Sequence, residues 1–218
     1  MRNWKEIVDA VRSKKSPELY PAQKQFVDCK AIGKAFCGGF ASGKTFVGAW
    51  DMLCHAEPNK VYLAAAPTYS MLEHVVYKTL RTLAVQFGMA DKSFGASHVM
   101  PPYMELKNGA RIILRSANDT QRGVAVSGAW LDESGYYDHN TARAFFDQYT
   151  SYYVDWVNYT LTPSEDANHW ATLIIKQYLQ VFTANTFDNL FVPLEHKKVI
   201  ASQYGNNSVY VTGRLLNG

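Results

Sequence analysis

The chain has 218 residues, with 22 Lys and Arg against 19 Asp and Glu, which gives a formal net charge of +3. This length allows one substantial hydrophobic core and is short for two full domains, and a hydrophobic content of 47% is typical of a globular protein. The small charge neither requires nor excludes nucleic acid as a partner, although a permanent DNA coat would usually be more basic.

The three cysteines, Cys29, Cys37 and Cys54, are odd in number and scattered along the chain. They form no C-x-x-C pair and no cluster with histidine, so free thiols in a reducing compartment are expected rather than a zinc site. The N-terminus, Met1–Glu6, lacks the apolar core of a signal peptide, and no stretch of the sequence approaches the length of a membrane span. We therefore expect a cytoplasmic protein with no membrane partner.

Two helices are predicted before the first strand. Apolar residues at helical spacing between Trp4 and Val11 predict an amphipathic helix over residues 3–13. A second, short helix is expected around residues 20–26. The apolar run Lys34–Cys37 then predicts a buried strand.

A glycine-rich loop follows this strand. Its eight residues fit the pattern G-x-x-x-x-G-K-[ST] at every fixed position. In this pattern the backbone N–H groups cradle phosphate oxygens, the lysine reaches the β- and γ-phosphates, and the final hydroxyl ligates Mg²⁺. Apolar residues over Thr45–Leu53 predict a helix whose N-terminal dipole would favour the same phosphates. The predicted nucleotide-binding loop consists of Gly38, Gly39, Phe40, Ala41, Ser42, Gly43, Lys44 and Thr45.

Downstream, predicted strands alternate with predicted helices. The strands are Val61–Ala66, Val126–Leu131, Val157–Leu161 and Gln180–Ala184, with a hairpin of Tyr103–Leu106 and Arg111–Arg115 around Asn108-Gly109. Helices are predicted over residues 72–87, 170–179 and 193–203. This alternation favours an α/β fold with a mainly parallel central sheet flanked by helices on both faces.

Two features leave their interpretation open. The aromatic-rich stretch Tyr149–Tyr159 is expected to pack beneath a sheet edge, and a stacking surface for bases is the alternative. Lys78, Arg81, Arg111 and Arg115 could contact DNA phosphates, but scattered charges are more often solvated. The DNA-contacting residues are therefore not assigned from the sequence.

A phosphate-binding loop needs a second, acidic group to hold Mg²⁺ and to activate water. Two adjacent carboxylates, Asp132 and Glu133, follow the apolar run that ends at Leu131. Neighbouring residues of a strand face opposite ways, so the two carboxylates can have different tasks. We expect Asp132 to help to hold Mg²⁺ and Glu133 to polarise the attacking water. Solvated turn residues are the alternative interpretation.

Two further residues carry weaker signals. Arg122, next to Gly123, is interpreted either as a surface charge of a loop or as an arginine finger that stabilises charge on the transferred phosphoryl group. Gln23 precedes the loop by a short helix, and its amide presents a donor and an acceptor that match an adenine edge.

In combination, these motifs resemble the ATPase domain of the large terminase subunit of tailed bacteriophages, the motor that packages DNA into viral capsids. The phosphate loop alone is shared by many NTPases, whereas its combination with the other motifs is much more specific. The resemblance runs over residues 15–218, through Tyr20–Gln23, Gly38–Thr45, Ala66–Thr68, Ser116–Gly123, Leu131–Ser134, Leu161–Pro163, His169-Trp170, Ala184–Asn189 and Gly213–Leu215.

The resemblance implies a P-loop NTPase of the ASCE/RecA-like class that uses ATP and Mg²⁺. It implies that Gln23 recognises adenine, that Lys44 and Thr45 belong to the Walker A motif, and that Asp132 and Glu133 form the Walker B pair. It also implies catalytic roles for Lys44 and Glu133, with Thr45 and Asp132 as the Mg²⁺ ligands.

For the remaining motifs, the resemblance implies roles in the action of an assembled motor. Arg122 would act in trans on the ATP of the neighbouring subunit, and Thr162 would couple hydrolysis to movement. The implied partners are double-stranded DNA, further copies of the chain in a ring, expected to be a pentamer on the portal, and a small terminase subunit. The implied location is the cytoplasm of the host cell.

The sequence departs from the family pattern in two ways. Phe40 occupies the third loop position, where family members often carry Arg, so any sensing role of that Arg is absent or moved. A nuclease domain usually follows in the family, and we expect it on a longer or separate chain, because residues 1–218 have no spare set of acidic residues for a two-metal site. Residues 1–218 are predicted to form one ATPase domain. The sequence does not decide whether residues from about 181 to 218 form a small lid subdomain within it.

Two other functions are retained as alternatives to a DNA-translocating ATPase. A helicase-like ATPase would need a second RecA-like domain, for which the chain is too short. An assembly module that binds ATP without hydrolysing it is disfavoured by the intact Glu133.

Overall fold

The computed structural model describes residues 16–90, 102–117, 125–151 and 154–216, apart from the side chains of residues 146–151. Within them, seven strands form one sheet in the order β3-β4-β2-β5-β6-β1-β7. All neighbouring strands are parallel except β3 and β4, which form the predicted antiparallel hairpin. The strands are β1 (Gly33–Gly38), β2 (Val61–Ala66), β3 (Tyr103–Glu105), β4 (Arg111–Ser116), β5 (Gly128–Asp132), β6 (Trp156–Leu161) and β7 (Gln180–Ala184).

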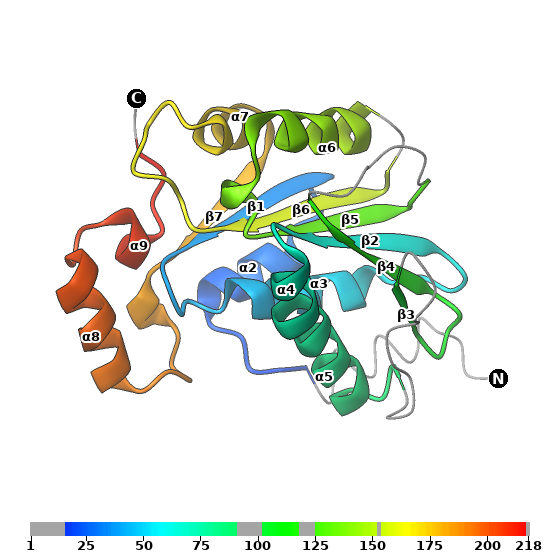
Figure 1. The fold of residues 1–218 in the computed structure, drawn as a ribbon. Coiled ribbons are helices and arrows are strands. Elements are labelled where there is room, and N and C mark those ends of the chain that lie inside the picture. The colour runs from blue at the N-terminus through cyan, green and yellow to red at the C-terminus, as the bar shows by residue number, and fades with distance from the viewer. Residues whose placement is uncertain (1–15, 91–101, 118–124, 152–153, 217–218) are drawn as a thin grey trace.

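Helices cover both faces of this sheet, which confirms the predicted fold class (Figure 1). In Figure 1, α2, α3, α4 and α5 lie on one side and α6 and α7 on the other, while α8 and α9 lie beyond the edge strand β7. The helices are α2 (Pro21–Asp28), α3 (Lys44–His55), α4 (Tyr69–Met71), α5 (Lys78–Gln86), α6 (His139–Ser151), α7 (Trp170–Tyr178), α8 (Leu194–Tyr204) and α9 (Val209–Thr212). Among the described residues, none of these helices is long and apolar enough to cross a membrane.

Alternation along the strands divides the interior into two hydrophobic cores. In β1, Phe36 belongs to the core beneath α2, α3 and α5, whereas Ala35 and Cys37 belong to the core beneath α6 and α7. Residues of β2 and β5 alternate in the same way, because successive side chains of a strand point to opposite faces. Both faces of the central strands are therefore buried, as expected for a parallel sheet.

A buried ion pair fixes α3 against the sheet. Lys34 of β1 and Asp51 of α3 are 1% and 0% exposed, and their Nζ and Oδ1 atoms lie 2.8 Å apart. Lys34 Nζ also donates to the carbonyl of Phe26, and Asn158 of β6 donates to Asp51. Because α3 begins at the phosphate loop, this network helps to hold the loop at the ends of β1 and β6.

Most of the predicted elements are observed, and a few differ. The helix predicted over residues 72–87 begins earlier, at Tyr69, and contains a π-helical turn over Leu72–Tyr77. Helix α6 (His139–Ser151) is not among the elements predicted from the sequence. The helix predicted over residues 3–13 lies outside the described residues.

The predicted lid subdomain covers β7 and the helices that follow it. Strand β7 pairs with β1 and is part of the main sheet. After Ala184 the chain forms a 3₁₀ turn over Thr186–Asp188 and then α8 and α9, which contact each other. A lid subdomain over about 181–218 stays a prediction.

Candidate active site

The predicted phosphate loop joins the carboxyl end of β1 to the N-terminus of α3, where ligands of open parallel sheets bind. Gly43 has φ of +85° and turns the chain into α3. Ala41 also has a left-handed φ, of +57°, which costs a non-glycine residue about 1–2 kcal/mol. The loop is therefore held in a conformation that it would not adopt without support from its surroundings.

That support comes partly from α2 and the residue before it. The hydroxyl of Tyr20 donates to the carbonyl of Ser42 at 2.6 Å. Gln23 Nε2 donates to the carbonyl of Gly43 at 3.3 Å. Burial raises the pKa of Tyr20, so the phenol keeps the proton that it donates.

Lys44 connects the phosphate loop to Glu133, the acidic residue that follows β5. Its side chain is 5% exposed, its Nζ donates to the carbonyl of Gly39 at 3.2 Å, and Nζ lies 3.4 Å from Glu133 Oε1. The ammonium group is therefore paired with the carboxylate that the sequence assigns to water activation. An arriving phosphate would compete with Glu133 for this cation.

Asp132 ends β5 and faces the start of α3. The hydroxyl of Thr45 donates to its Oδ2 at 3.0 Å, and the hydroxyl of Thr160 donates to its Oδ1 at 2.6 Å. The Thr160 hydroxyl in turn accepts from Trp130 Nε1 at 2.8 Å, which fixes its orientation. Burial, with a smaller contribution from the Glu133 charge, raises the pKa of Asp132 to about 7.

These groups suit Mg²⁺. A hydroxyl and a carboxylate meet at 3.0 Å at the mouth of the loop, and both are the hard oxygen ligands that Mg²⁺ prefers. A cation there would favour the charged carboxylate, which burial alone disfavours. In the part of the chain that the structure describes, no group of three His, Cys, Asp or Glu side chains could hold a metal, so a bound Mg²⁺ would need phosphate and water ligands as well.

Glu133 does not continue the strand, which differs from the expectation that the two carboxylates face opposite ways as strand neighbours. Its φ of +45° and ψ of +39° are left-handed, and they turn its side chain towards the loop. Its Oε2 lies 3.4 Å from the backbone N of Thr162 and 3.5 Å from the Thr162 hydroxyl. The left-handed turn therefore brings both carboxylates to the same site.

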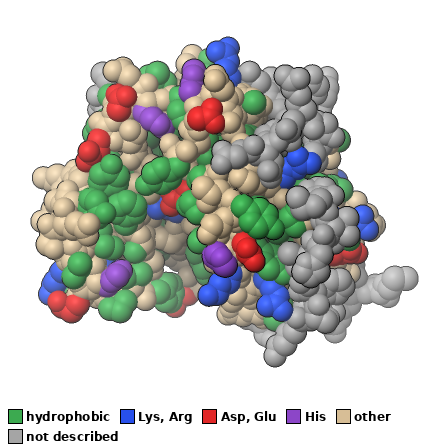
Figure 2. Space-filling model, viewed as in Figure 1, with side chains coloured by type: hydrophobic (Ala, Val, Ile, Leu, Met, Phe, Trp, Pro, Cys, Tyr) green, Lys and Arg blue, Asp and Glu red, His purple; other side chains and the backbone are tan. Residues whose placement is uncertain are grey.

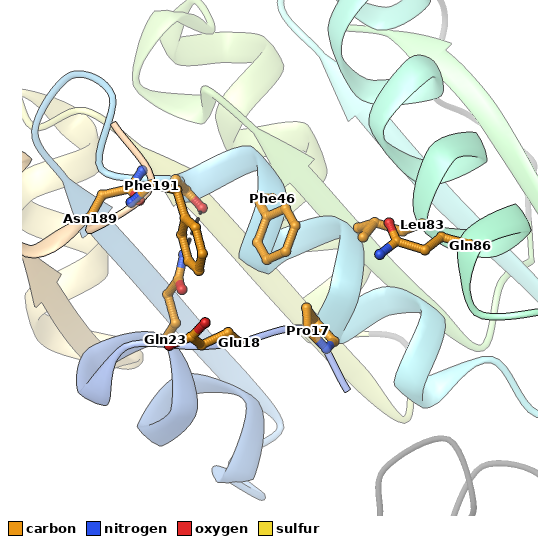
Figure 3. Close-up of a pocket in the computed structure, with 9 residues that line it drawn as sticks. Pro17, Glu18, Gln23, Phe46, Leu83, Gln86, Asn189 and Phe191 are labelled. Carbon is orange, nitrogen blue, oxygen red and sulfur yellow. Dashed lines mark hydrogen bonds between the residues drawn. The ribbon is translucent and has the colours of Figure 1, made fainter. Parts of the chain in front are cut away.

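A cavity of about 330 Å³ opens beside the loop (Figure 3). In Figure 3, Phe46 lies between Phe191 on one side and Leu83 and Gln86 on the other, with Gln23 close to Phe191. The cavity is lined by Pro17, Glu18, Gln23, Gly43, Phe46, Leu83, Gln86, Asn189 and Phe191. Its aromatic walls and its few amides suit a flat heterocycle next to the phosphate loop.

Phe40 packs into an aromatic cluster formed with α8 and α9. Its ring stacks on Tyr210 with a centroid distance of 5.3 Å and lies 5.1 Å from the ring of Tyr204. Its N–H donates to the carbonyl of Tyr210 at 2.6 Å. Figure 2 shows hydrophobic side chains gathered over α9 on this face. The third loop position is thus a packing contact in this chain.

The structure gathers five of the predicted site residues at one edge of the sheet: Lys44, Thr45, Asp132, Glu133 and Thr162. Arg122 lies outside the described residues. Sequence reasoning missed Tyr20, Thr160, Thr186 and Asn189 as partners of the site. Three of these four lie within motifs of the resemblance, which was the available signal.

The sequence matches the family model of the terminase large subunit, T4likevirus-type, N-terminal, over residues 35–208. This chain belongs to that terminase family. The match covers most of the chain and confirms the family that the motifs indicated. No curated protein matches the chain.

Solved terminase structures share the fold. The large terminase of a thermophilic bacteriophage has a TM-score of 0.73 and 14% identity, over 92% of this chain and 54% of that one. The same phage protein in complex with ADP has a TM-score of 0.72 and 15% identity, over 91% of this chain and 54% of that one. The large terminase ATPase domain of Thermus phage P74-26 has a TM-score of 0.69 and 15% identity, over 97% of this chain and 96% of that one. The chain thus spans about half the length of the first of these terminases and nearly all of an ATPase domain.

Proposed function

We propose that this terminase chain is an ATP-hydrolysing motor domain that translocates double-stranded DNA into a procapsid. The observation that carries the proposal is the 3.0 Å contact between Thr45 of the phosphate loop and Asp132 at the end of β5. It brings the Walker A and Walker B motifs together at the carboxyl edge of the sheet. The ADP complex of the thermophilic phage terminase supports nucleotide binding at this fold.

In the proposed reaction, the loop amides and Lys44 bind the phosphates of ATP. Thr45 and Asp132 would hold Mg²⁺, which neutralises phosphate charge when bound. Glu133 accepts a proton from water as the water oxygen attacks the γ-phosphorus, and the bond to the β-phosphate oxygen breaks to leave ADP. The products are ADP and inorganic phosphate.

The ion pair between Lys44 and Glu133 links the binding of phosphate to the availability of the proposed catalytic base. Lys44 Nζ and Glu133 Oε1 lie 3.4 Å apart. Phosphate groups attract Lys44 more strongly than one carboxylate does, because they carry more negative charge. Glu133 is then released from the cation and is free to contact water.

The base of ATP would occupy the cavity beside the loop, between Phe46 and Phe191. Gln23 lines this cavity and also donates to the carbonyl of Gly43 at 3.3 Å. Its amide would thus contact both the base and the loop. This arrangement supports the role in adenine recognition that the family resemblance implies.

The proposed motor works as a ring. Arg122 would reach the ATP of the neighbouring subunit, and Thr162 would couple hydrolysis to movement of the DNA. The proposed assembly is a pentamer on the portal, with a small terminase subunit and a nuclease domain on a longer or separate chain. Packaging would take place in the cytoplasm of the host cell.

ATP turnover per protomer, measured over a wide range of protein concentration, tests the proposal. A rate that rises steeply with concentration would support a site completed between subunits, whereas a flat rate would favour a helicase-like, self-sufficient ATPase. Lys44→Ala is the control, because its phosphate site lacks the main cation and should bind no ATP. ATP binding without turnover at any concentration would favour an assembly module.

The trans role of Arg122 has a test of its own. Arg122→Ala should lose about 4 kcal/mol of transition-state stabilisation if this residue is an arginine finger. Mixing Arg122→Ala with Lys44→Ala protein should restore some turnover, because mixed interfaces pair an intact site with an intact finger. No recovery in an assembly shown to be mixed would argue against action in trans.

A further inference from the structure

The first half of the phosphate loop is held from outside by the segment that follows β7. The Thr186 hydroxyl donates to the carbonyl of Phe40 at 2.8 Å. Asn189 Nδ2 donates to the carbonyl of Ala41 at 2.8 Å. These contacts join residues 146 and 148 positions apart in the chain. No motif assigns either side chain to nucleotide chemistry.

Both donors are built into the structure. Thr186 is fully buried, and Asn189 is 9% exposed. The Asn189 Oδ1 atom accepts from the backbone N of Phe191 at 3.1 Å, which orients the amide so that Nδ2 faces the loop. A Cβ at Gly39 would lie 2.7 Å from Thr186 Oγ1, so a glycine is needed for this close approach.

The direction of the held carbonyls decides where the loop amides point. In a trans peptide the C=O of one residue and the N–H of the next are antiparallel. Holding the Phe40 carbonyl against Thr186 therefore turns the Ala41 N–H away from the segment after β7. Holding the Ala41 carbonyl against Asn189 fixes the next peptide as well, and the N–H of that peptide, at Ser42, donates to the Gly39 carbonyl at 3.2 Å. These two peptides flank the left-handed Ala41, whose φ is +57°.

We propose that Thr186 and Asn189 are positioning residues that keep the phosphate loop open for phosphate. They act on the peptides on either side of Ala41 and need not touch the nucleotide phosphates themselves. The inference rests on the proposed function, because it assumes that this loop binds nucleotide phosphates. It adds to that function two residues of the Ala184–Asn189 motif, to which the family resemblance assigned no role.

The cleanest test compares Thr186→Val with Thr186→Ser in the full chain. Valine keeps the volume and removes the donor, whereas serine keeps the donor. Loss of one hydrogen bond predicts that Thr186→Val binds ADP and inorganic pyrophosphate about three- to tenfold more weakly in titration calorimetry. Thr186→Ser should stay within about twofold of the wild type, because its hydroxyl can still reach the Phe40 carbonyl.

Asn189→Asp provides a second test with a different control. The carboxylate keeps the acceptor for Phe191 and replaces the donor to Ala41. Because Asn189 also lines the base cavity, pyrophosphate, which has no base, separates the two roles. Asn189→Leu removes the donor without adding the negative charge of aspartate, which itself repels phosphate. Weaker binding of both ADP and pyrophosphate by both variants supports positioning of the loop, whereas weaker binding of ADP alone assigns Asn189 to the base cavity and overturns its positioning role.

Steady-state kinetics distinguishes positioning from a general loss of structure. A positioning role predicts that KM for ATP rises in Thr186→Val by about the same factor as the pyrophosphate Kd, and that Thr186→Ser restores it. A lower kcat and melting temperature with unchanged KM would instead assign Thr186 to folding alone and overturn the inference.

The proposed function and this inference fail in different ways. If the wild type does not bind ADP, and Lys44→Ala changes nothing, both are overturned. If the wild type binds ADP through Lys44, but Thr186→Val and Asn189→Asp bind pyrophosphate as tightly as the wild type, only the inference is overturned.

Discussion

Glu133 Oε2 lies 3.4 Å from the backbone N and 3.5 Å from the hydroxyl of Thr162, at the end of β6. The Thr162 residue is 5% exposed and the Glu133 side chain 17%, so the contact is largely buried while the carboxylate keeps some access to solvent. The residue that the family resemblance assigns to coupling thus contacts the proposed catalytic carboxylate directly. A change in the position of Glu133 during hydrolysis would therefore displace Thr162 at the carboxyl end of β6.

Thr162→Val should lower kcat for ATP hydrolysis about fivefold and leave nucleotide affinity unchanged, because it removes one oriented donor to Glu133. Thr162→Ser keeps this donor and is the matched control. Steady-state kinetics with titration of ADP checks both values. Equal kcat for the valine and serine variants would show that the Thr162 hydroxyl does not orient Glu133.

Glu133→Gln should bind ATP within about threefold of the wild type, and turnover should fall by about 100-fold or more. The amide keeps an oxygen that can accept from Thr162, but it cannot take up the proton of water. Single-turnover hydrolysis alongside ATP titration measures both quantities. Rapid hydrolysis by this variant would place the general base on another residue.

Phe40→Ala should destabilise the contact of α8 and α9 with the loop by about 1–2 kcal/mol, because one aromatic face of the cluster with Tyr204 and Tyr210 is lost. Phe40→Leu keeps most of the volume and separates packing from ring stacking. Hydrogen exchange of amides in residues 194–212 reports on this contact. Unchanged exchange in Phe40→Ala would mean that the cluster does not fasten these helices to the loop.

Lys34→Met should lower the free energy of unfolding by about 3–5 kcal/mol, because it leaves the buried charge of Asp51 without its partner. The double variant Lys34→Met with Asp51→Leu removes both charges and should recover part of this loss. Denaturant unfolding of the wild type, Lys34→Met, Asp51→Leu and the double variant gives the four free energies. A double variant less stable than the sum of its two single variants would contradict this account.

His169 is expected to make stability depend on pH. It precedes α7, its Nδ1 accepts from the N–H of Ala171 at 3.3 Å, and burial lowers its pKa. A lowered pKa means that the folded state binds fewer protons than the unfolded state. The stability contribution is therefore complete above the unfolded pKa of about 6.5 and is lost as pH falls through the lower folded pKa.

His169→Asn isolates this effect, because asparagine keeps an acceptor for the helix N-terminus and does not titrate there. Between about pH 7 and pH 5, the wild type should lose more free energy of unfolding than His169→Asn does. Denaturant unfolding at several pH values checks the difference. Parallel pH profiles for the two proteins would remove His169 from the explanation.

The sequence alone determined those features that depend on neighbouring residues. The loop Gly38–Thr45 is recognisable because glycine positions and a lysine at fixed spacing are a local requirement of phosphate binding. The strands were predictable because burial on both faces demands continuous apolar runs, and the hairpin because Asn108-Gly109 suits a tight turn. The adjacent carboxylates Asp132 and Glu133 were found because they follow such a run.

Only the tertiary structure decided how these pieces meet. The contacts of Thr160 with Asp132, of Thr186 with the Phe40 carbonyl and of the Phe40 ring with Tyr204 and Tyr210 join residues far apart in the chain. Such contacts depend on the order of the strands and on the packing of helices across them, and neither leaves a periodic signal in the sequence. The left-handed turn at Glu133 is of the same kind, because surrounding contacts, rather than the preference of glutamate, keep a side chain in that conformation.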